Sequence, residues 1–211
     1  MSLIKYKQKR NFEATPEPIA SKKSANDENI FVVQRHHASH LHYDFRLELN
    51  GTLKSWAVPK GPSLNPTDKR LAMMVEDHPV SYANFEGDIP EGNYGAGHVD
   101  VWDHGTYEPV DETGKVISHT QFAKDLKSGS IKFVLKGKKL KGEFALVNMK
   151  KDDKAWLLIK HKDKYATDED YNSEDFAKKS SLAYTEKRNA AKKTTTKKTG
   201  KSATKTVKKK P

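Results

Sequence analysis

Residues 41–58 read LHYDFRLELNGTLKSWAV and contain the strongest local structural signal in the sequence. Apolar side chains occupy every second position from Leu41 to Leu49, which is the period of a β-strand with one apolar face. The dipeptide Asn50-Gly51 follows, and it favours the two-residue turn of a β-hairpin. Residues 53–58 can supply the returning strand, so the stretch predicts a β-hairpin.

Six further segments have the length and composition of short strands, and turns rich in proline and glycine separate them. They are Ile30–Arg35, Leu71–Val75, His98–Trp102, Ser130–Leu135, Gly142–Met149 and Ala155–His161. One short helix is expected at about Ser118–Lys127, with Ser118 or Thr120 as its cap. Eight short strands and one helix predict a mainly β fold, a compact β-barrel of about eight strands.

The sequence on either side of the expected barrel is polar. Residues 1–29 predict an extended N-terminal arm with little regular structure, residues 30–165 the barrel, and residues 166–186 a polar linker. Residues 187–211 hold 11 lysines and arginines and no acid; removing these 11 from the total of 39 leaves 28 basic against 28 acidic residues. The whole charge excess therefore lies in this Lys-rich tail, for which we expect disorder and binding to nucleic-acid phosphates.

Composition excludes several classes of protein. Because cysteine is absent, disulfides and thiolate metal sites are impossible, and a metal would need histidine or carboxylate ligands. No run of 18 apolar residues is present, which argues against a membrane-spanning helix, and the first residues lack the apolar stretch of a secretory signal. We expect a cytoplasmic monomer that associates with the nucleoid through its basic tail.

The polar face of the expected strand 41–49 carries residues suited to chemistry. His42, Asp44 and Arg46 project to one side, opposite the apolar stripe. A half-exposed strand also has a polar face, so this pattern has a purely structural explanation. However, a histidine and an aspartate two residues apart can bind one metal ion, and an arginine beside them suits a phosphate oxygen.

A third metal ligand can come from the segment just upstream. HHASHLH, residues 36–42, holds four histidines, and spacing alone does not choose among His36, His37 and His40. Two histidines and one carboxylate leave coordination positions open on a divalent ion, as catalysis requires.

Residues further along the chain can extend such a site. The candidates are Lys60, Arg70, Glu76, His78 and Tyr82. Each of them alone is more simply explained as a solvated or loop residue. The stretch EGDIPEGNYGAG, residues 86–97, lacks the GxxxxGK[ST] pattern of a phosphate-binding loop, and we interpret it as turns that permit close backbone approach.

Long parts of the sequence resemble the 3′-phosphoesterase domain of bacterial DNA ligase D. The two main parts are FVVQRHHASHLHYDFRLELNGTLKSWAVPKGPSLNPTDKRLAMMVEDHP (residues 31–79) and SYANFEGDIPEGNYGAGHVDVWDHGTYEP (residues 81–109). KRNFEATPEP resembles the leader of that domain, and LKGKKLKGEFALVNM with AWLLIKHKD resembles its end. The similarity covers about residues 5–164, and we expect a stand-alone form because there is no room for polymerase or ligase modules.

The resemblance implies a fold and an activity. Members of the family are β-barrels that remove a 3′-terminal ribonucleoside and then the 3′-phosphate, leaving a 3′-OH that can be sealed. Manganese is the implied cofactor (Mn2+), and other divalent transition metals such as Co2+ are implied substitutes. The implied partners are DNA or RNA/DNA 3′ ends at primer-template junctions, together with a separate ATP-dependent DNA ligase or Ku.

The resemblance also assigns residues. The family's metal ligands fall on His36, His42 and Asp44, which selects His36 from the candidates above. Its phosphate and active-site contacts fall on Gln34, Arg46, Lys60, Arg70, Glu76, His78 and Tyr82, and its leader residues on Arg10 and Glu17. Of these, His78 is the expected acid or base, whereas Tyr82 is expected to donate a hydrogen bond to phosphate rather than to act as a nucleophile.

Three positions depart from the family pattern. Asn11 and His37 stand where the family usually has aspartate, and His40 stands where it usually has arginine. The missing carboxylate at position 11 keeps open a non-catalytic or weakly active DNA-end binding module. A non-haem iron oxygenase uses the same ligand types, but several cations near the ligands favour a phosphate substrate.

Overall fold

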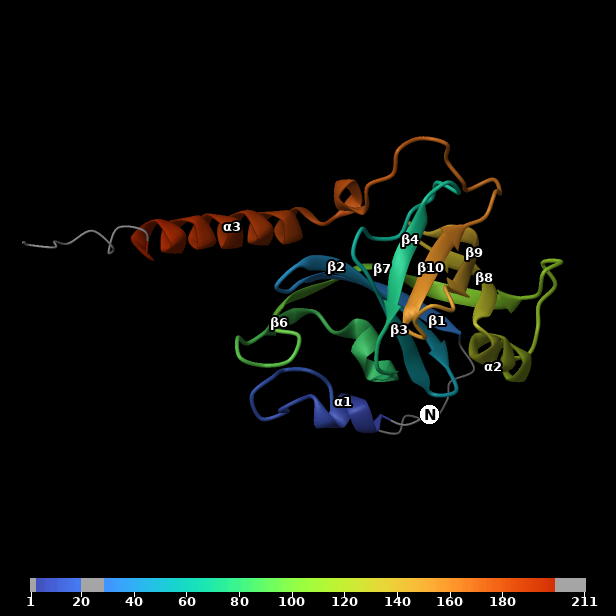
Figure 1. The fold of residues 1–211 in the computed structure, drawn as a ribbon, viewed down its shortest axis with the longest axis horizontal. Coiled ribbons are helices and arrows are strands. Elements are labelled where there is room, and N and C mark those ends of the chain that lie inside the picture. Colours follow the sequence, from blue (N-terminus) through green and yellow to red (C-terminus); the bar gives the residue numbers. More distant parts are fainter. Residues whose placement is uncertain (1–2, 20–28, 200–211) are drawn as a thin grey trace, which may run out of the picture. The chain divides into compact units, whose positions relative to one another are not determined.

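The computed structural model describes residues 3–19 and 29–199, and within them ten strands form one antiparallel sheet (Figure 1). The strands are β1 (Ile30–His37), β2 (Leu41–Leu49), β3 (Thr52–Val58), β4 (Lys69–Met74), β5 (His78–Pro79), β6 (Gly87–Ile89), β7 (Gly97–Val110), β8 (Ser130–Gly137), β9 (Lys141–Asn148) and β10 (Ala155–Lys160). Eight pair in the order β1-β2-β3-β4-β10-β9-β8-β7, and β1 also pairs with β7. This pairing closes the sheet and confirms the predicted β-barrel of about eight strands.

The described helical segments are short except for the last one. They are α1 (Ile4–Gln8), η1 (Val80–Asn84), α2 (His119–Ser128), η2 (Ser173–Phe176) and α3 (Lys179–Thr199). The expected helix is α2, and the hydroxyl of Ser118 accepts a hydrogen bond from the Gln121 amide at its start. No helix in the described residues is long and apolar enough to cross a membrane.

The hairpin of β2 and β3 has the predicted turn. Asn50 and Gly51 both have positive φ values, 54° and 77°, as a two-residue hairpin turn of this kind requires. This turn sets the register and places Arg46 opposite Ser55. The turn chemistry therefore fixes which residues of β3 lie beside the polar face of β2.

Both faces of β2 are buried. Tyr43, Phe45 and Leu47 point into the barrel, where the Phe45 ring lies 5.8 Å from the Phe133 ring. The opposite face lies under a second, smaller apolar layer. Its members come from the arm, from η1 and from the outer faces of the strands: Tyr6, Val32, Leu53, Tyr82, Ala83, Phe85, Ile89 and Val99.

The N-terminal arm is more ordered than the sequence predicts. Helix α1 lies within it, and Tyr6 is completely buried with its hydroxyl donating to the Pro18 carbonyl oxygen at 2.6 Å. The sequence shows no helical period there because the helix has only five residues and one buried side chain. The rest of the arm up to residue 29 includes residues 20–28, which lie outside the described residues.

The C-terminal boundaries also differ from the prediction. The unit that contains the barrel extends to Phe176 rather than to about residue 165, because residues 166–176 make specific contacts with it. Residues 177–211 form a second unit, in which α3 covers 179–199 where disorder was expected from residue 187. The expected disorder of residues 200–211 falls outside the described residues.

Strand β7 is much longer than the predicted His98–Trp102. Its sequence contains Gly105 and Pro109, which normally interrupt a strand. A Cβ atom on Gly105 would lie 2.3 Å from the Lys136 carbonyl oxygen, so glycine is needed for β7 to approach β8 there. Glycine at position 105 therefore allows the strand to continue past the predicted end at Trp102.

Candidate metal centre and active site

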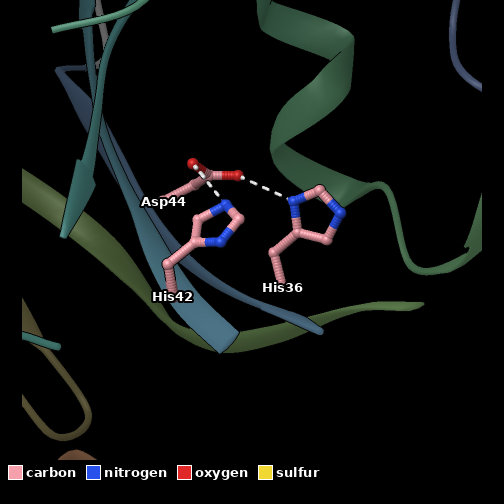
Figure 2. A group of neighbouring side chains, drawn as sticks. All are labelled: His36, His42 and Asp44. Carbon is pink, nitrogen blue, oxygen red and sulfur yellow. Dashed lines mark ion pairs between the residues drawn. The ribbon is translucent and has the colours of Figure 1, made fainter. Parts of the chain in front are cut away.

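Three of the predicted ligands meet on the outer face of β1 and β2 (Figure 2). His36 and His42 are direct cross-strand partners, and Asp44 follows two residues along β2. Asp44 Oδ2 lies 3.5 Å from His36 Nδ1, and Asp44 Oδ1 lies 3.7 Å from His42 Nε2. One ligand atom from each residue lies within 4.8 Å of the others, a spacing that can hold one metal ion.

Hydrogen bonds orient both imidazole rings for metal binding. His36 Nε2 lies 2.8 Å from the Gly95 carbonyl oxygen, and His42 Nδ1 lies 3.0 Å from the His40 carbonyl oxygen. A carbonyl only accepts, so each of these nitrogens donates a proton, and the other nitrogen is the one through which the neutral ring can bind a metal. Those two nitrogens are the ones nearest Asp44. The donor set fits a divalent transition metal.

Arg46 holds the third ligand in its charged form. Its Nη2 donates to Asp44 Oδ2 at 3.0 Å. Burial alone would raise the pKa of Asp44, but the charge of Arg46 is the largest opposing effect, and that pKa is held well below its ordinary value. Asp44 is therefore a carboxylate at neutral pH and can ligate a cation.

Arg46 is almost fully occupied by contacts within the protein. Its Nε donates to Gln34 Oε1 and its Nη1 to the Ser55 hydroxyl, both at 2.8 Å, and Nη1 also lies 3.0 Å from His78 Nδ1. Gln34, Ser55 and Asp44 accept three of the five guanidinium hydrogens, and the second Nη1 hydrogen lies beside His78. One Nη2 hydrogen is left for a substrate oxygen.

The N-terminal arm completes the site through Arg10. Its guanidinium donates to Glu17 Oε1 at 2.9 Å and to Glu76 Oε1 at 2.8 Å, and its Nη2 lies 3.1 Å from His78 Nε2. The Tyr82 hydroxyl also donates to Glu17 Oε1, at 3.0 Å. The arm and the residues after β4, about 66 positions apart in sequence, thus form one hydrogen-bonded cluster beside the metal ligands.

His78 is held in its neutral form. Burial lowers its pKa well below the ordinary value, and the charges of Arg46 and Arg10 lower it further because an imidazolium would lie between two guanidinium groups. Its Nε2 accepts from Arg10, so the ring proton belongs on Nδ1, which lies 2.9 Å from the Glu76 carbonyl oxygen. A neutral imidazole can accept a proton but has none to supply as an acid at neutral pH.

Burial also keeps Tyr82 protonated. It raises the pKa of the Tyr82 hydroxyl well above its ordinary value, so the phenolate needed for nucleophilic attack is strongly disfavoured. The expected hydrogen bond from Tyr82 to phosphate stays a prediction. In the structure its hydrogen goes to Glu17.

The ligands open into a cavity of about 210 Å³. Eight of the predicted residues line it: Arg10, His36, His42, Asp44, Arg46, Glu76, His78 and Tyr82. Gln34 and Glu17 lie behind this lining, where Gln34 Nε2 donates to the Tyr82 and Phe85 carbonyl oxygens. Both support other site residues rather than face the cavity.

Two predicted phosphate contacts are not brought to the cavity. Lys60 is exposed in the turn after β3, and Arg70 on β4 donates to Asp68 Oδ2 at 2.8 Å and to the Tyr171 carbonyl oxygen at 2.7 Å. Neither lines the cavity. Arg70 instead connects the barrel to residues near its C-terminal end.

Sequence reasoning missed several residues of the site. Tyr94 and Gly95 line the cavity, and Lys9 Nζ lies 4.4 Å from the centre of the Tyr94 ring. The interpretation of residues 86–97 as turns for close backbone approach is supported, since a Cβ on Gly97 would lie 2.3 Å from the His37 carbonyl oxygen. Ser55 could have been found, because the Asn-Gly turn fixes its pairing with Arg46.

Comparison with known proteins identifies the family of this fold and site. The sequence profile of the DNA ligase D 3′-phosphoesterase domain matches residues 34–148, more than half of the chain and the part that contains the candidate metal ligands. The chain belongs to this family. The 3′-phosphoesterase domain family of DNA ligase D thus accounts for the barrel and for the resemblance seen in the sequence.

Curated relatives are larger proteins. The chain is 49% identical over 165 residues to the multifunctional non-homologous end joining protein LigD of Pseudomonas aeruginosa, covering 76% of this chain and 19% of the relative. It is 44% identical over 156 residues to the multifunctional non-homologous end joining DNA repair protein LigD of Mycobacterium tuberculosis, covering 74% of this chain and 19% of the relative. It is 42% identical over 172 residues to LigD of Mycolicibacterium smegmatis, covering 80% of this chain and 22% of the relative. The chain thus spans about a fifth of the length of these relatives.

The lowered pKa of His78 predicts a dependence of stability on pH. The unfolded chain binds a proton at His78 below about pH 6.5, whereas the folded protein does not, so acid favours unfolding. We expect metal-free protein to lose up to about 1.4 kcal/mol of unfolding free energy per pH unit from this residue as the pH falls from 6.5 towards 5. Urea unfolding in chelator at several pH values measures this slope.

The variant His78→Gln should show a shallower slope than the parent protein in that window. His104→Gln is the matched control because the His104 side chain is exposed on β7, and its slope should equal that of the parent. Equal slopes for all three proteins would show that His78 is protonated in the folded state as readily as in the unfolded chain.

Proposed function

We propose that this protein is a DNA 3′-end-processing phosphoesterase that removes a 3′-terminal ribonucleoside, a 3′-phosphate or both, leaving a 3′-OH that a ligase can seal. The observation that carries the proposal is a ligand triad with metal-facing lone pairs next to Arg46, in an open cavity, within the family's 3′-phosphoesterase domain. The proposed role is DNA repair by non-homologous end joining, the process named for the relatives.

Manganese is the proposed metal, with His36, His42 and Asp44 as its ligands. Mixed nitrogen and oxygen donors suit Mn2+ and also Co2+. When bound, the metal would polarise a phosphate oxygen and lower the pKa of a bound water.

The remaining roles fall to side chains already placed around the cavity. The last Nη2 hydrogen of Arg46 is directed to a non-bridging phosphate oxygen, where it stabilises charge that develops during the reaction. His78 begins the reaction neutral, so we assign it hydrogen bonding or proton acceptance rather than acid catalysis. Arg10 keeps His78 in place, and Glu76 and Glu17 keep Arg10 in place.

Lys60 and Arg70 receive weaker roles. Lys60 is exposed and can contact the DNA backbone away from the reacting phosphate. For Arg70 we propose no substrate contact, because its guanidinium donates to Asp68 and to the Tyr171 carbonyl oxygen.

The structure offers a reason why Asn11 is compatible with activity. Asn11 is exposed, its Oδ1 accepts from the Glu13 amide at 3.2 Å, and its carbonyl accepts from the amides of Ala14 and Thr15. Aspartate and asparagine both form this kind of turn. The turn that leads from Arg10 to Glu17 is thus retained without the carboxylate.

The proposed partners follow from the proposed reaction. They are DNA or RNA/DNA 3′ ends at primer-template junctions and, for subsequent sealing, a separate ATP-dependent DNA ligase or Ku. The basic residues from 187 onward would add sequence-independent affinity for DNA phosphates, which weakens as salt rises.

An end-resolved assay tests the function. Primer-templates ending in a 3′-ribonucleotide, a 3′-phosphate or a 3′-OH are incubated with the protein and Mn2+, Co2+, Mg2+ or chelator, and the products are separated by length and end group. We expect conversion of the first two ends to 3′-OH with Mn2+ and none in chelator. DNA binding without any end conversion in every metal would support the end-binding module instead, and activity that requires oxygen and a 2-oxoacid would support the oxygenase.

A further inference from the structure

Residues 167–176 form a C-terminal strap on the barrel. The Thr167 amide donates to the Leu64 carbonyl oxygen at 3.0 Å, and the Ser173 hydroxyl donates to the Pro62 carbonyl oxygen at 2.6 Å. The indole of Trp102 donates to the Ser173 carbonyl oxygen at 3.0 Å, and Ser173 is completely buried. The strap lies outside the part matched by the family profile, which ends at residue 148.

One side chain of the strap connects the two strands that carry the metal ligands. Glu174 Oε1 and Oε2 accept from Arg35 Nε and Nη2, both at 2.8 Å, in a two-point ion pair. Glu174 Oε1 also accepts from the Tyr43 hydroxyl. Arg35 belongs to β1 and Tyr43 to β2, so one carboxylate binds both strands.

The contacts of Glu174 with Arg35 and Tyr43 lie close to the candidate metal ligands. Arg35 and Tyr43 are direct cross-strand partners, and the next pair along the same ladder is His36 with His42. Because successive residues of a strand point to opposite faces, Arg35 and Tyr43 face away from the cavity while the ligands face it. Glu174 therefore binds β1 and β2 on the face opposite the cavity. The two residues that it contacts are the sequence neighbours of the two histidine ligands.

We propose that Glu174 is a positioning residue that holds β1 and β2 in the register and spacing that the metal site requires. The inference rests on the proposed metal site. The Arg35 side chain is 1% exposed and that of Glu174 28% exposed, so removal of the carboxylate leaves a buried guanidinium without its two-point partner. Without the Glu174 carboxylate, β1 and β2 can shift relative to each other. Such a shift changes the separation of the His36 and His42 rings, whose centres lie 4.7 Å apart.

The test measures Mn2+ binding by calorimetric titration of metal-free protein, with 3′-phosphate removal as a second readout. Glu174→Ala should weaken Mn2+ binding by roughly 10–100-fold, the range found when groups that support metal ligands are removed. Glu174→Gln can still accept one hydrogen bond and should restore part of that affinity. Tyr43→Phe, which removes only the hydroxyl, should cause the smallest loss.

Asp175→Ala is the matched control, because Asp175 is the next residue of the strap and contacts Asn172 rather than the barrel strands. It should bind Mn2+ as the parent does. Circular dichroism in chelator establishes whether each variant is folded. If Glu174→Ala is not folded, the Mn2+ affinities of Glu174→Gln and Tyr43→Phe, compared with that of the parent protein, decide the question. Folded variants at Glu174 that bind Mn2+ with the parent's affinity would overturn the proposal, whereas a parent protein that binds no Mn2+ would overturn the metal site itself.

Discussion

Replacing His42 with alanine is expected to lower Mn2+-dependent release of phosphate from a DNA 3′-phosphate by more than about 100-fold. Groups that merely orient metal ligands change affinity or activity by about 10–100-fold, and His42 supplies one of the two ring nitrogens of the triad. Its side chain is 23% exposed, so the unfolding free energy of metal-free protein should change by only about 0.5 kcal/mol. The measurements are phosphate release with Mn2+ and urea unfolding in chelator.

The matched control for this prediction lies two residues away. His40→Ala removes an exposed imidazole but keeps the backbone carbonyl that accepts from His42 Nδ1. It should retain activity, which would exclude His40 as a metal ligand. Full activity in His42→Ala would show that the triad does not hold the catalytic metal.

Replacing Arg46 with lysine is expected to reduce both activity and stability, even though the charge is kept. An ammonium group cannot reproduce the planar set of hydrogen bonds to Gln34, Ser55 and Asp44. Two or more buried polar groups then lose a partner, each at a cost of about 1–3 kcal/mol. We expect a loss of about 3 kcal/mol in unfolding free energy and at least a 100-fold loss of phosphate release, because the substrate also loses its guanidinium hydrogen.

A variant of a second buried cation distinguishes the loss of stability from the loss of activity. Lys54 pairs with Asp77 and its side chain is 3% exposed, so Lys54→Gln also breaks a buried ion pair of the same hairpin. It should lose comparable stability while folded protein keeps its affinity for Mn2+ and its activity at low temperature. Equal activity per folded molecule for the parent and Arg46→Lys would show that Arg46 has only a structural role.

The strongest local patterns of the sequence predicted the centre of the fold. The alternation in residues 41–49 and the Asn-Gly turn were enough to place His42, Asp44 and Arg46 on one face and to set the hairpin. Strand β1 gave no such signal. Its Phe31 and Val33 face one side and its Val32 the other, and all three are buried, so periodicity could not tell the face of His36 from that of His37.

Long-range contacts account for what the sequence could not predict. Arg10 meets Glu76 and His78 only because the arm folds back over the strands, and no local pattern encodes that path. The family resemblance identified Arg10 and Glu17 as site residues without showing that they hold other side chains in place. The same resemblance assigned phosphate contacts to Lys60 and Arg70, neither of which lies at the cavity.

The burial of both faces of β2 has a consequence for tolerance to mutation. A strand with one solvent face normally accepts many substitutions at every second position. In β2 the inward residues fill the barrel, and the outward residues from Asp44 to Glu48 are 2–7% exposed. A saturation library over residues 43–49 should therefore contain almost no neutral positions, and variants with altered metal preference will be recovered more readily from the loop around Tyr94 and Gly95 than from the strand that supplies two of the three ligands.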